Sequence, residues 1–287
     1  MKRRELIKGA AMVASLRGSR LAAAEAAADE ATAGSTPTAD RWHGLKAGVA
    51  SYTLRKMPLD AAIKAIQRVG LRYVSIKDFH LPLDSTTEQR KAVAARFKEA
   101  GITPLSCGNV SMKNDTADVR RAFEYARDVG LPTIVCSPDP DSMKILDAMV
   151  REFDIRLAIH NHGPEDKRFP SPYDVWKAVQ PYDKRIGLCI DVGHTARTAV
   201  DVVKSIAEAG DRLLDIHMKD LKSFKEKGSQ CEVGDGAMPV VEIFKQLKKM
   251  NYRGCVNLEY ESHSDNPLPG MQKSFAYMRG VLAGLRG

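Results

Sequence analysis

The sequence has few aromatic residues, few cysteines and no long apolar run, and each shortage excludes a class of protein. Aromatic residues are 6% of the 287 positions and no Lys/Arg-rich segment interleaves with them, so the net charge of +8 is weak evidence for nucleic-acid binding. No apolar stretch reaches the roughly 18 residues of a membrane-spanning helix. The five cysteines are an odd number without CxxC spacing, which argues against a disulfide framework or a zinc ribbon. We therefore expect a globular protein that binds no nucleic acid and has no membrane span.

The N-terminal segment differs in composition from the rest of the chain. The pair Arg3 and Arg4 is followed by an apolar stretch and then by an alanine-rich segment. This order resembles a twin-arginine export signal, although two further arginines interrupt the apolar part. We expect a signal at 1–28, a small polar linker at 29–40 and export to the periplasm. A basic amphipathic helix of a cytoplasmic protein is the alternative.

Residues 41–287 alternate short β-rich runs with amphipathic helical stretches. The eight expected strands are 46–52, 72–77, 102–107, 132–137, 155–160, 186–191, 213–218 and 254–260. The eight expected helices are 58–69, 87–100, 116–129, 141–153, 172–180, 199–209, 238–250 and 270–284. Several helices end in a glycine that leads into the next strand, as at Gly70 and Gly130. Eight βα units without a GxGxxG motif after the first strand predict a single-domain (β/α)8 TIM barrel, an α/β fold.

Ionisable side chains gather where the expected strands end, which is where ligands bind in such barrels. Five of the seven histidines stand at these ends. Four consecutive strands end in His160, Asp191, His217 and Glu259. Burying ionisable groups in a barrel mouth costs free energy unless they are paired or bound to metal. Two imidazoles and two carboxylates suit Mn, Mg, Co, Zn or Fe, so we expect these four to bind one divalent metal ion. For each residue singly, a hydrogen-bonded strand end is the alternative.

Other polar residues at the same strand ends complete the candidate site. Lys77 and Lys219 are candidate catalytic groups, because a lysine can neutralise an alkoxide or donate a proton. Ion pairs with Asp78 and Asp220 are the alternative for these two lysines. The candidate substrate contacts are His80, His162, His194, Arg197 and Glu261.

Three fragments carry a resemblance to a known family. CIDVGH, DIHMKD and VNLEYE, in this order, resemble the last three barrel strands of the xylose-isomerase-like TIM barrel superfamily, which includes sugar phosphate isomerases and epimerases and AP endonuclease 2. The similarity covers essentially all of 46–284. It implies that Asp191, His217 and Glu259 are metal ligands, and that His194 contacts substrate or a further metal. The sequence departs from the family at His160, which stands where the family has a glutamate.

This departure bears on the reaction that the resemblance implies. Epimerases of the family use two glutamates on opposite faces of the sugar, and here only Glu259 remains. We expect a metal-dependent isomerase or epimerase that acts through an enediolate on a small keto-sugar or sugar derivative, with Glu259 as base and His160 as a second catalytic group. The chain also resembles 3-keto-glycoside lyases and hydratases that share its His-Asn-His sequence, so β-elimination is an alternative.

Two further alternatives belong to other classes of protein. One is a barrel that binds sugar and metal without catalysis. The other is a DNA-repair enzyme like endonuclease IV, which needs further histidine ligands on the early strands and does not fit an exported protein. The sequence leaves the sugar, the metal and the oligomeric state open, a homo-oligomer included.

Overall fold

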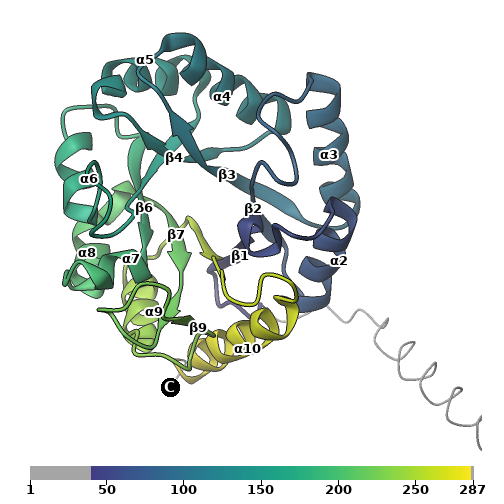
Figure 1. The fold of residues 1–287 in the computed structure, drawn as a ribbon, viewed down its shortest axis with the longest axis vertical. Coiled ribbons are helices and arrows are strands. Elements are labelled where there is room, and N and C mark those ends of the chain that lie inside the picture. Colours follow the sequence, from purple (N-terminus) through teal and green to yellow (C-terminus); the bar gives the residue numbers. More distant parts are fainter. Residues whose placement is uncertain (1–39, 286–287) are drawn as a thin grey trace, which may run out of the picture. The chain divides into compact units, whose positions relative to one another are not determined.

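Eight parallel strands close into a barrel in the order β1-β10-β7-β6-β5-β4-β3-β2 (Figure 1). The strands are β1 (Lys46–Ala50), β2 (Tyr73–Ile76), β3 (Thr103–Met112), β4 (Thr133–Pro138), β5 (Arg156–His160), β6 (Ile186–Asp191), β7 (Leu213–Met218) and β10 (Cys255–Leu258). The predicted (β/α)8 barrel is thus confirmed.

The computed structural model describes residues 40–285. The predicted export signal at 1–28 lies outside the described residues, and so does the predicted linker except for its last residue, Asp40. The barrel described below belongs to the unit that begins at Trp42.

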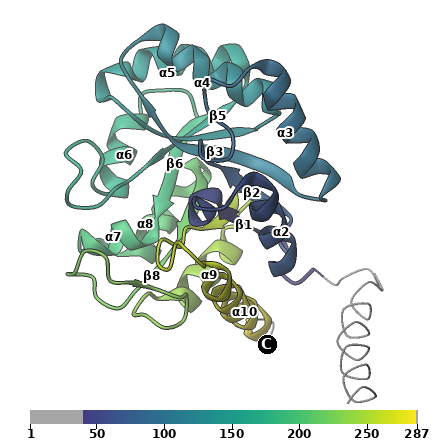
Figure 2. The same ribbon diagram turned by 45° about the vertical axis from the view of Figure 1, so that its right-hand side comes forward.

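Helices surround the strands on the outside of the barrel (Figures 1 and 2). They are α2 (Leu59–Val69), α3 (Thr87–Glu99), α4 (Thr116–Val129), α5 (Met143–Phe153), α6 (Pro172–Val179), α7 (Val192–Arg197), α8 (Val202–Ala209), α9 (Val240–Lys249) and α10 (Leu268–Gly284). Helices α2 and α4 end as predicted, with Gly70 and Gly130 in the left-handed conformation at φ 77° and 82°. A side chain there would be strained, so glycine lets the chain turn directly into the next strand.

Two of the strands that carry the site, β6 and β7, are buried along their whole length. All six residues of β6 (IGLCID) and of β7 (LLDIHM) are buried. Parallel strands covered by helices read as nearly continuous apolar runs, which explains these sequences. The polar exceptions point into the barrel: Asp215 accepts hydrogen bonds from Ser106 Oγ at 2.9 Å and from Asn257 Nδ2 at 2.8 Å. This network forms a polar layer below the mouth.

Several predicted boundaries were wrong, all close to the mouth. The first strand ends at Ala50, because residues Ser51–Leu54 form a 3-10 helix. The third strand continues to Met112 instead of ending at Cys107. Helix α7 and the hairpin of β8 (Asp220–Leu221) and β9 (Gln230–Cys231) were not predicted. Elements of two to six residues are too short to show a periodic pattern of apolar residues.

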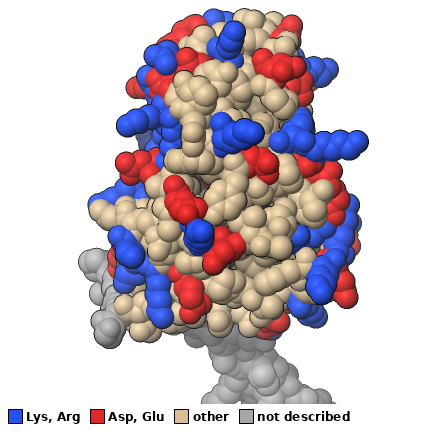
Figure 3. All heavy atoms as spheres, turned by 90° about the vertical axis from the view of Figure 1, so that its left-hand side faces the viewer, with Lys and Arg blue, Asp and Glu red and all other residues tan. Residues whose placement is uncertain are grey.

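Within residues 40–285, no helix is both long and apolar enough to cross a membrane. On the face shown in Figure 3, lysine and arginine side chains are interspersed with aspartate and glutamate. This face therefore carries no single-sign field of the kind that attracts a phosphate backbone.

Candidate active site

The predicted ligands come together at the C-terminal mouth of the barrel. His160 ends β5, Asp191 ends β6, His217 lies one residue before the end of β7, and Glu259 follows β10. Asp191 and His217 are direct partners in the β6–β7 register. One nitrogen or oxygen atom from each of the four side chains lies within 4.8 Å of the others. The predicted convergence is therefore present, and we refer to these four residues as the outer cluster.

The contacts within the outer cluster place four potential metal-ligand atoms around one point. His160 Nε2 lies 3.0 Å from His217 Nδ1 and 3.5 Å from Asp191 Oδ2. His217 Nδ1 lies 3.2 Å from Glu259 Oε2. Asp191 Oδ2 is buried and makes no hydrogen bond. This mixed nitrogen and oxygen set fits a divalent first-row cation.

Backbone and side-chain contacts fix the orientation of Asp191. Its Oδ1 accepts a hydrogen bond from the backbone N–H of His194 at 2.8 Å and so caps the N-terminus of α7. Its backbone N–H donates to Asn161 Oδ1 at 3.1 Å, and Asn161 Nδ2 donates to Thr195 Oγ1 at 3.1 Å. Because Oδ1 is used for the cap, Oδ2 is left to face the outer cluster.

Lys219 is the buried cation beside the outer cluster. Its Nζ lies 2.9 Å from Glu259 Oε2 and 3.2 Å from Asp191 Oδ2, and it also donates to Glu261. Burial alone would lower the pKa of Lys219, but the three carboxylates outweigh it and raise that pKa well above its usual range. The three carboxylates outnumber the ammonium of Lys219, and even with His217 protonated they leave an excess of negative charge, which a bound cation would reduce.

The alternative of an ion pair between Lys219 and Asp220 was wrong. The carboxylate of Asp220 accepts backbone hydrogen bonds from Gly234 at 2.8 Å, Gly236 at 3.2 Å and Met238 at 3.0 Å. Asp220 therefore holds the loop before α9, and Lys219 is left to serve the site.

The ionisation of the outer cluster follows from its burial and from Lys219. Burial lowers the pKa of His160 to about 3, so this ring is neutral at physiological pH. Burial would raise the pKa of Glu259, but Lys219 and His217 hold it well below its usual range. Lys219 does the same for Asp191. The neutral imidazole of His160 and the two ionised carboxylates are in the protonation states that bind metal. Burial would lower the pKa of His217, but Cys189 and Glu259 outweigh it and raise that pKa well above its usual range, so a metal that binds this ring would displace a proton.

Two more predicted residues stand at the edge of the outer cluster. The ring of His162 lies 4.3 Å from that of His160, measured between centroids, and its Nε2 lies 2.9 Å from Asn109 Nδ2. The ring of His194 lies 6.0 Å from that of His160, and its Nδ1 is buried without a hydrogen bond. Both imidazoles are thus placed beside the four potential ligands.

A pocket of about 360 Å³ opens next to Lys219. Four of the predicted site residues line it: His194, Arg197, Lys219 and Glu261. Arg197 is paired with Glu165, and its side chain is 10% exposed. This pocket therefore presents both signs of charge and several hydrogen-bonding groups, as a polyhydroxylated ligand requires.

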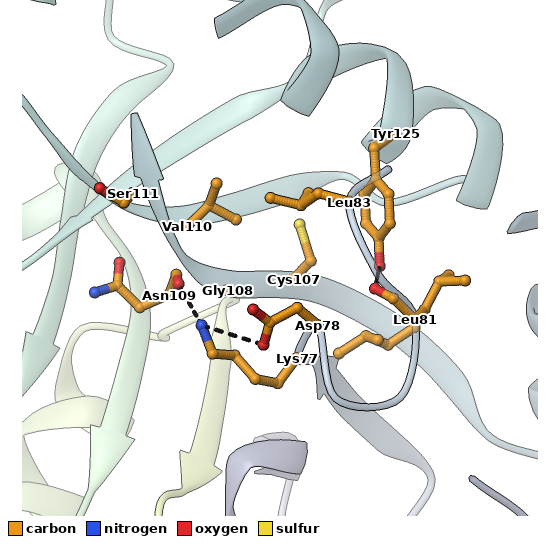
Figure 4. Close-up of a pocket in the computed structure, with 11 residues that line it drawn as sticks. Lys77, Asp78, Leu81, Leu83, Cys107, Gly108, Asn109, Val110, Ser111 and Tyr125 are labelled. Carbon is orange, nitrogen blue, oxygen red and sulfur yellow. Dashed lines mark hydrogen bonds and ion pairs between the residues drawn. The ribbon is translucent and has the colours of Figure 1, made fainter. Parts of the chain in front are cut away.

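Lys77 lies in a second pocket, of about 230 Å³, at the ends of β2 and β3 (Figure 4). Its Nζ donates to the backbone oxygen of Asn109 at 2.7 Å and lies 3.6 Å from Asp78 Oδ1. The ion pair with Asp78, which was the alternative for Lys77, is thus formed. Through its own side chain Asn109 reaches His162, so it joins this pocket to the imidazole that stands beside the outer cluster.

The structure does not support a substrate contact for His80. Its side chain is buried, with Nδ1 2.9 Å from Ser51 Oγ and Nε2 3.1 Å from the backbone oxygen of Met57. Both ring nitrogens are therefore used inside the protein, and His80 fixes the 3-10 helix after β1 to the loop after β2.

The burial of His80 predicts sensitivity to acid. Burial lowers its pKa below the usual value of 6.5, so below that pH the unfolded chain binds a proton that the folded chain excludes. We expect His80 to lower the free energy of unfolding by up to about 1.4 kcal/mol for each pH unit below 6.5. Denaturant unfolding between pH 4 and 7 measures this slope. His80→Gln should reduce it, and an unchanged slope would contradict the assignment.

Sequence reasoning missed two residues that position the site. Asn109 follows the expected end of the third strand and was given no role in the site, although β3 continues through it. Asn161 was passed over between two histidines, although it holds the backbone of Asp191. The signal for both was an amide next to a strand end, which is common and so carries little information.

The xylose isomerase-like TIM barrel family matches residues 63–281. An uncharacterized protein of Methanocaldococcus jannaschii is 24% identical over 218 residues, which cover 68% of this chain and 73% of that protein. Inosose dehydratase of Mesomycoplasma hyopneumoniae is 24% identical over 152 residues, which cover 46% of this chain and 50% of the dehydratase. This chain thus aligns with half of that enzyme.

Solved structures of similar fold cover most of the chain at low sequence identity. L-ribulose 3-epimerase has a TM-score of 0.71 at 14% identity, with 84% of this chain and 96% of the epimerase covered. The zinc-bound IolI protein has a TM-score of 0.69 at 15% identity, with 84% and 99% covered. The 3-keto-D-glucoside 4-epimerase YcjR of E. coli has a TM-score of 0.68 at 17% identity, with 82% and 99% covered. These likenesses show the fold, and the match over residues 63–281 shows that this chain belongs to the family of xylose isomerase-like TIM barrels.

Proposed function

We propose that this chain is a metal-dependent carbohydrate enzyme that removes a proton from the carbon beside the carbonyl of a keto-sugar or related cyclic polyol, with isomerisation as the outcome. The outer cluster carries this proposal. Three of its side chains are at most 3% exposed, whereas that of Glu259 is 12% exposed. Glu259 is thus both a potential ligand and the carboxylate that a substrate in the mouth could reach.

His160, Asp191, His217 and Glu259 would hold the cation. A divalent cation bound there would polarise the substrate carbonyl and lower the cost of charge on its oxygen. We propose Mn, Mg, Co, Zn or Fe as the metal, and the zinc-bound IolI neighbour, which has a similar fold, supports a metal-dependent protein.

The residues around the cation have separate tasks in this proposal. Glu259 accepts the proton from carbon. Lys219 Nζ, 2.9 Å from Glu259 Oε2, stabilises negative charge that develops on a substrate oxygen. His162, His194, Arg197 and Glu261 bind hydroxyl groups at the rim. Lys77 serves a part of the substrate that enters the second pocket.

His160 makes one-sided chemistry the better fit. Two-sided epimerisation needs a proton acceptor on each face of the substrate, and a buried neutral imidazole whose Nε2 faces Asp191 and His217 is committed to the cluster. Isomerisation through an enediol needs only one base, because the same group can move a proton between neighbouring carbons. The names of relatives support carbohydrate chemistry, since inosose dehydratase and L-ribulose 3-epimerase both act on sugars or sugar-like substrates.

A second candidate function is β-elimination from a keto-glycoside. The second pocket favours it, because apolar Leu81, Leu83 and Val110 face a polar edge formed by Lys77 and Asn109 (Figure 4). A pocket of this size and mixed character has room for a leaving group beside the sugar at the outer cluster. The first half of the reaction, proton removal by Glu259, is the same.

Incubation with a panel of keto-sugars and 3-keto-glycosides in D2O tests the proposal, with NMR as the readout and each divalent metal supplied in turn. Exchange of one C–H with interconversion of sugars is the expected result. Exchange with release of an aglycone or of water would favour the elimination. A metal-loaded protein that exchanges no proton on any sugar would contradict both and favour a barrel that only binds sugar.

His160→Glu tests the one-sided assignment. The change recreates the two-glutamate arrangement but places a new negative charge where Nε2 lies 3.5 Å from Asp191 Oδ2. We expect turnover to fall by about tenfold or more with no gain in epimerisation, because that charge repels Asp191 and alters the cluster. Product ratios by NMR measure the outcome. A variant that epimerises faster than the native protein would refute the assignment.

We also propose that residues 1–28 direct export through the twin-arginine route. The support is the Arg3-Arg4 pair and the segment that follows it. N-terminal sequencing of the protein from its native host is the test, and mature protein should begin near residue 30. An intact Met1 on protein recovered from the cytoplasm would refute it.

A further inference from the structure

A buried thiol lies below the outer cluster. Cys189 is on β6, two residues before Asp191, and so points to the same side of the strand one layer deeper in the barrel. Its Sγ and one ring nitrogen from each of His160 and His217 lie within 4.8 Å of one another, and all three residues are buried. The two imidazoles therefore have oxygen ligands on one side and a sulfur within reach on the other.

The two imidazoles also have unused nitrogens. His160 Nε2 and His217 Nδ1 face each other and the carboxylates, but His160 Nδ1 and His217 Nε2 are buried without any hydrogen-bond partner. A buried polar atom left unpaired costs about 1–3 kcal/mol. Two such atoms on adjacent rings, beside a thiol, indicate that these rings can bind something other than the outer carboxylates.

We propose that His160, Cys189 and His217 form an inner metal-binding set that selects a soft cation such as Cd²⁺. A thiolate ligand favours such a cation over Mg²⁺ or Mn²⁺, which prefer the oxygens of the outer cluster. On binding, the thiol of Cys189 gives its proton to water and a sulfur–metal bond forms in place of the S–H bond. No change of oxidation state is involved.

The inner set and the outer cluster share both imidazoles. They exclude one another because a neutral imidazole carries a proton on one ring nitrogen and can bind metal only through the other. A cation held by Cys189 would take His160 and His217 away from Asp191 and Glu259. Soft cations therefore inhibit, whereas hard cations activate. This last step rests on the proposed function; the binding itself does not.

Cadmium titration of the metal-free full-length chain tests the inner set. We expect one equivalent of Cd²⁺ to produce the ultraviolet charge-transfer band of a thiolate–cadmium bond, and ¹¹³Cd NMR of the native protein to show a sulfur-ligated cadmium. Cys189→Ser should lose the band. Cys136→Ser is the matched control, since Cys136 is equally buried in the neighbouring part of the barrel but lies outside the three-residue set, and it should keep the band.

Two results of the titration would overturn the proposal. One is Cd²⁺ that binds, as measured by calorimetry, without a thiolate band or a sulfur-shifted ¹¹³Cd signal in the native protein. The other is a band that persists in a folded Cys189→Ser variant. The ¹¹³Cd signal of the native protein decides the question if that variant does not fold.

A kinetic measurement tests the regulatory step. With Mn²⁺-loaded enzyme, Cys189→Ser should raise the Cd²⁺ concentration for half-inhibition by about tenfold or more, as loss of a ligand predicts. Equal inhibition of both proteins would overturn the regulatory step. If no sugar is turned over, the proposed function fails while the titration still decides whether the inner set binds.

Discussion

Glu259→Gln is expected to keep the fold and to lower kcat by about 10³-fold, the range that a general base contributes. Glutamine has the shape of glutamate but cannot accept a proton from carbon. It also removes one of the negative charges around Lys219, so cation binding should weaken. Turnover measured at rising metal concentrations separates the two effects, because added metal restores occupancy but not the base.

Glu232→Gln is the matched control for this change. Glu232 is a nearby carboxylate that accepts a hydrogen bond from the Tyr260 hydroxyl at 2.7 Å, and it takes no part in the outer cluster. Its variant should keep turnover close to that of the native protein. Full turnover by Glu259→Gln at saturating metal would show that the base is a different residue.

Lys219→Met is expected to destabilise the metal-free protein by about 3–5 kcal/mol, the cost of removing one partner from a buried ion pair. The side chain of Lys219 is 5% exposed and that of Asp191 is fully buried, so water cannot replace the lost ammonium. In a chain of this length the melting temperature should fall by on the order of 10 °C. Saturating divalent cation should recover part of the loss, since it would neutralise the same carboxylates.

Thermal unfolding with and without metal measures this effect. Lys273→Met is the control, because Lys273 pairs with Asp235 at the surface with 57% of its side chain exposed, and such pairs contribute about 1 kcal/mol or less. If the metal-free Lys219→Met protein were as stable as the native one, the charges of the buried carboxylates would have to be neutralised by another group.

The barrel was predictable because its signal is repeated. Each buried strand reads as an apolar run, and glycines such as Gly70 and Gly130 mark where a helix gives way to a strand. The errors in the predicted element boundaries lie at the mouth of the barrel, where contacts between neighbouring segments determine where an element ends. The 3-10 helix after Ala50 and the six-residue helix that Asp191 caps depend on hydrogen bonds between segments, which no periodicity reveals.

The residues of the candidate site could be predicted from the sequence, but most of the contacts between them could not. The order of strand ends brought His160, Asp191, His217 and Glu259 together, because parallel strands end on the same side of a barrel. Position along the chain could not show that His80 is used up by Ser51 and Met57. Position along the chain also could not show that Lys219 forms ion pairs with three carboxylates, because the closed barrel determines which side chains of other strands lie next to it.

The most direct test of the proposed metal centre is anomalous diffraction from crystals of the protein with Mn²⁺. We expect one strong peak at the barrel mouth, within about 2.0–2.4 Å of one atom each from His160, Asp191, His217 and Glu259. We also expect the peak to be lost in an Asp191→Asn variant, whose amide keeps the shape of the cap but not the charge. No peak at saturating Mn²⁺, or a peak bound by other side chains, would contradict the central claim that these four residues form a metal centre.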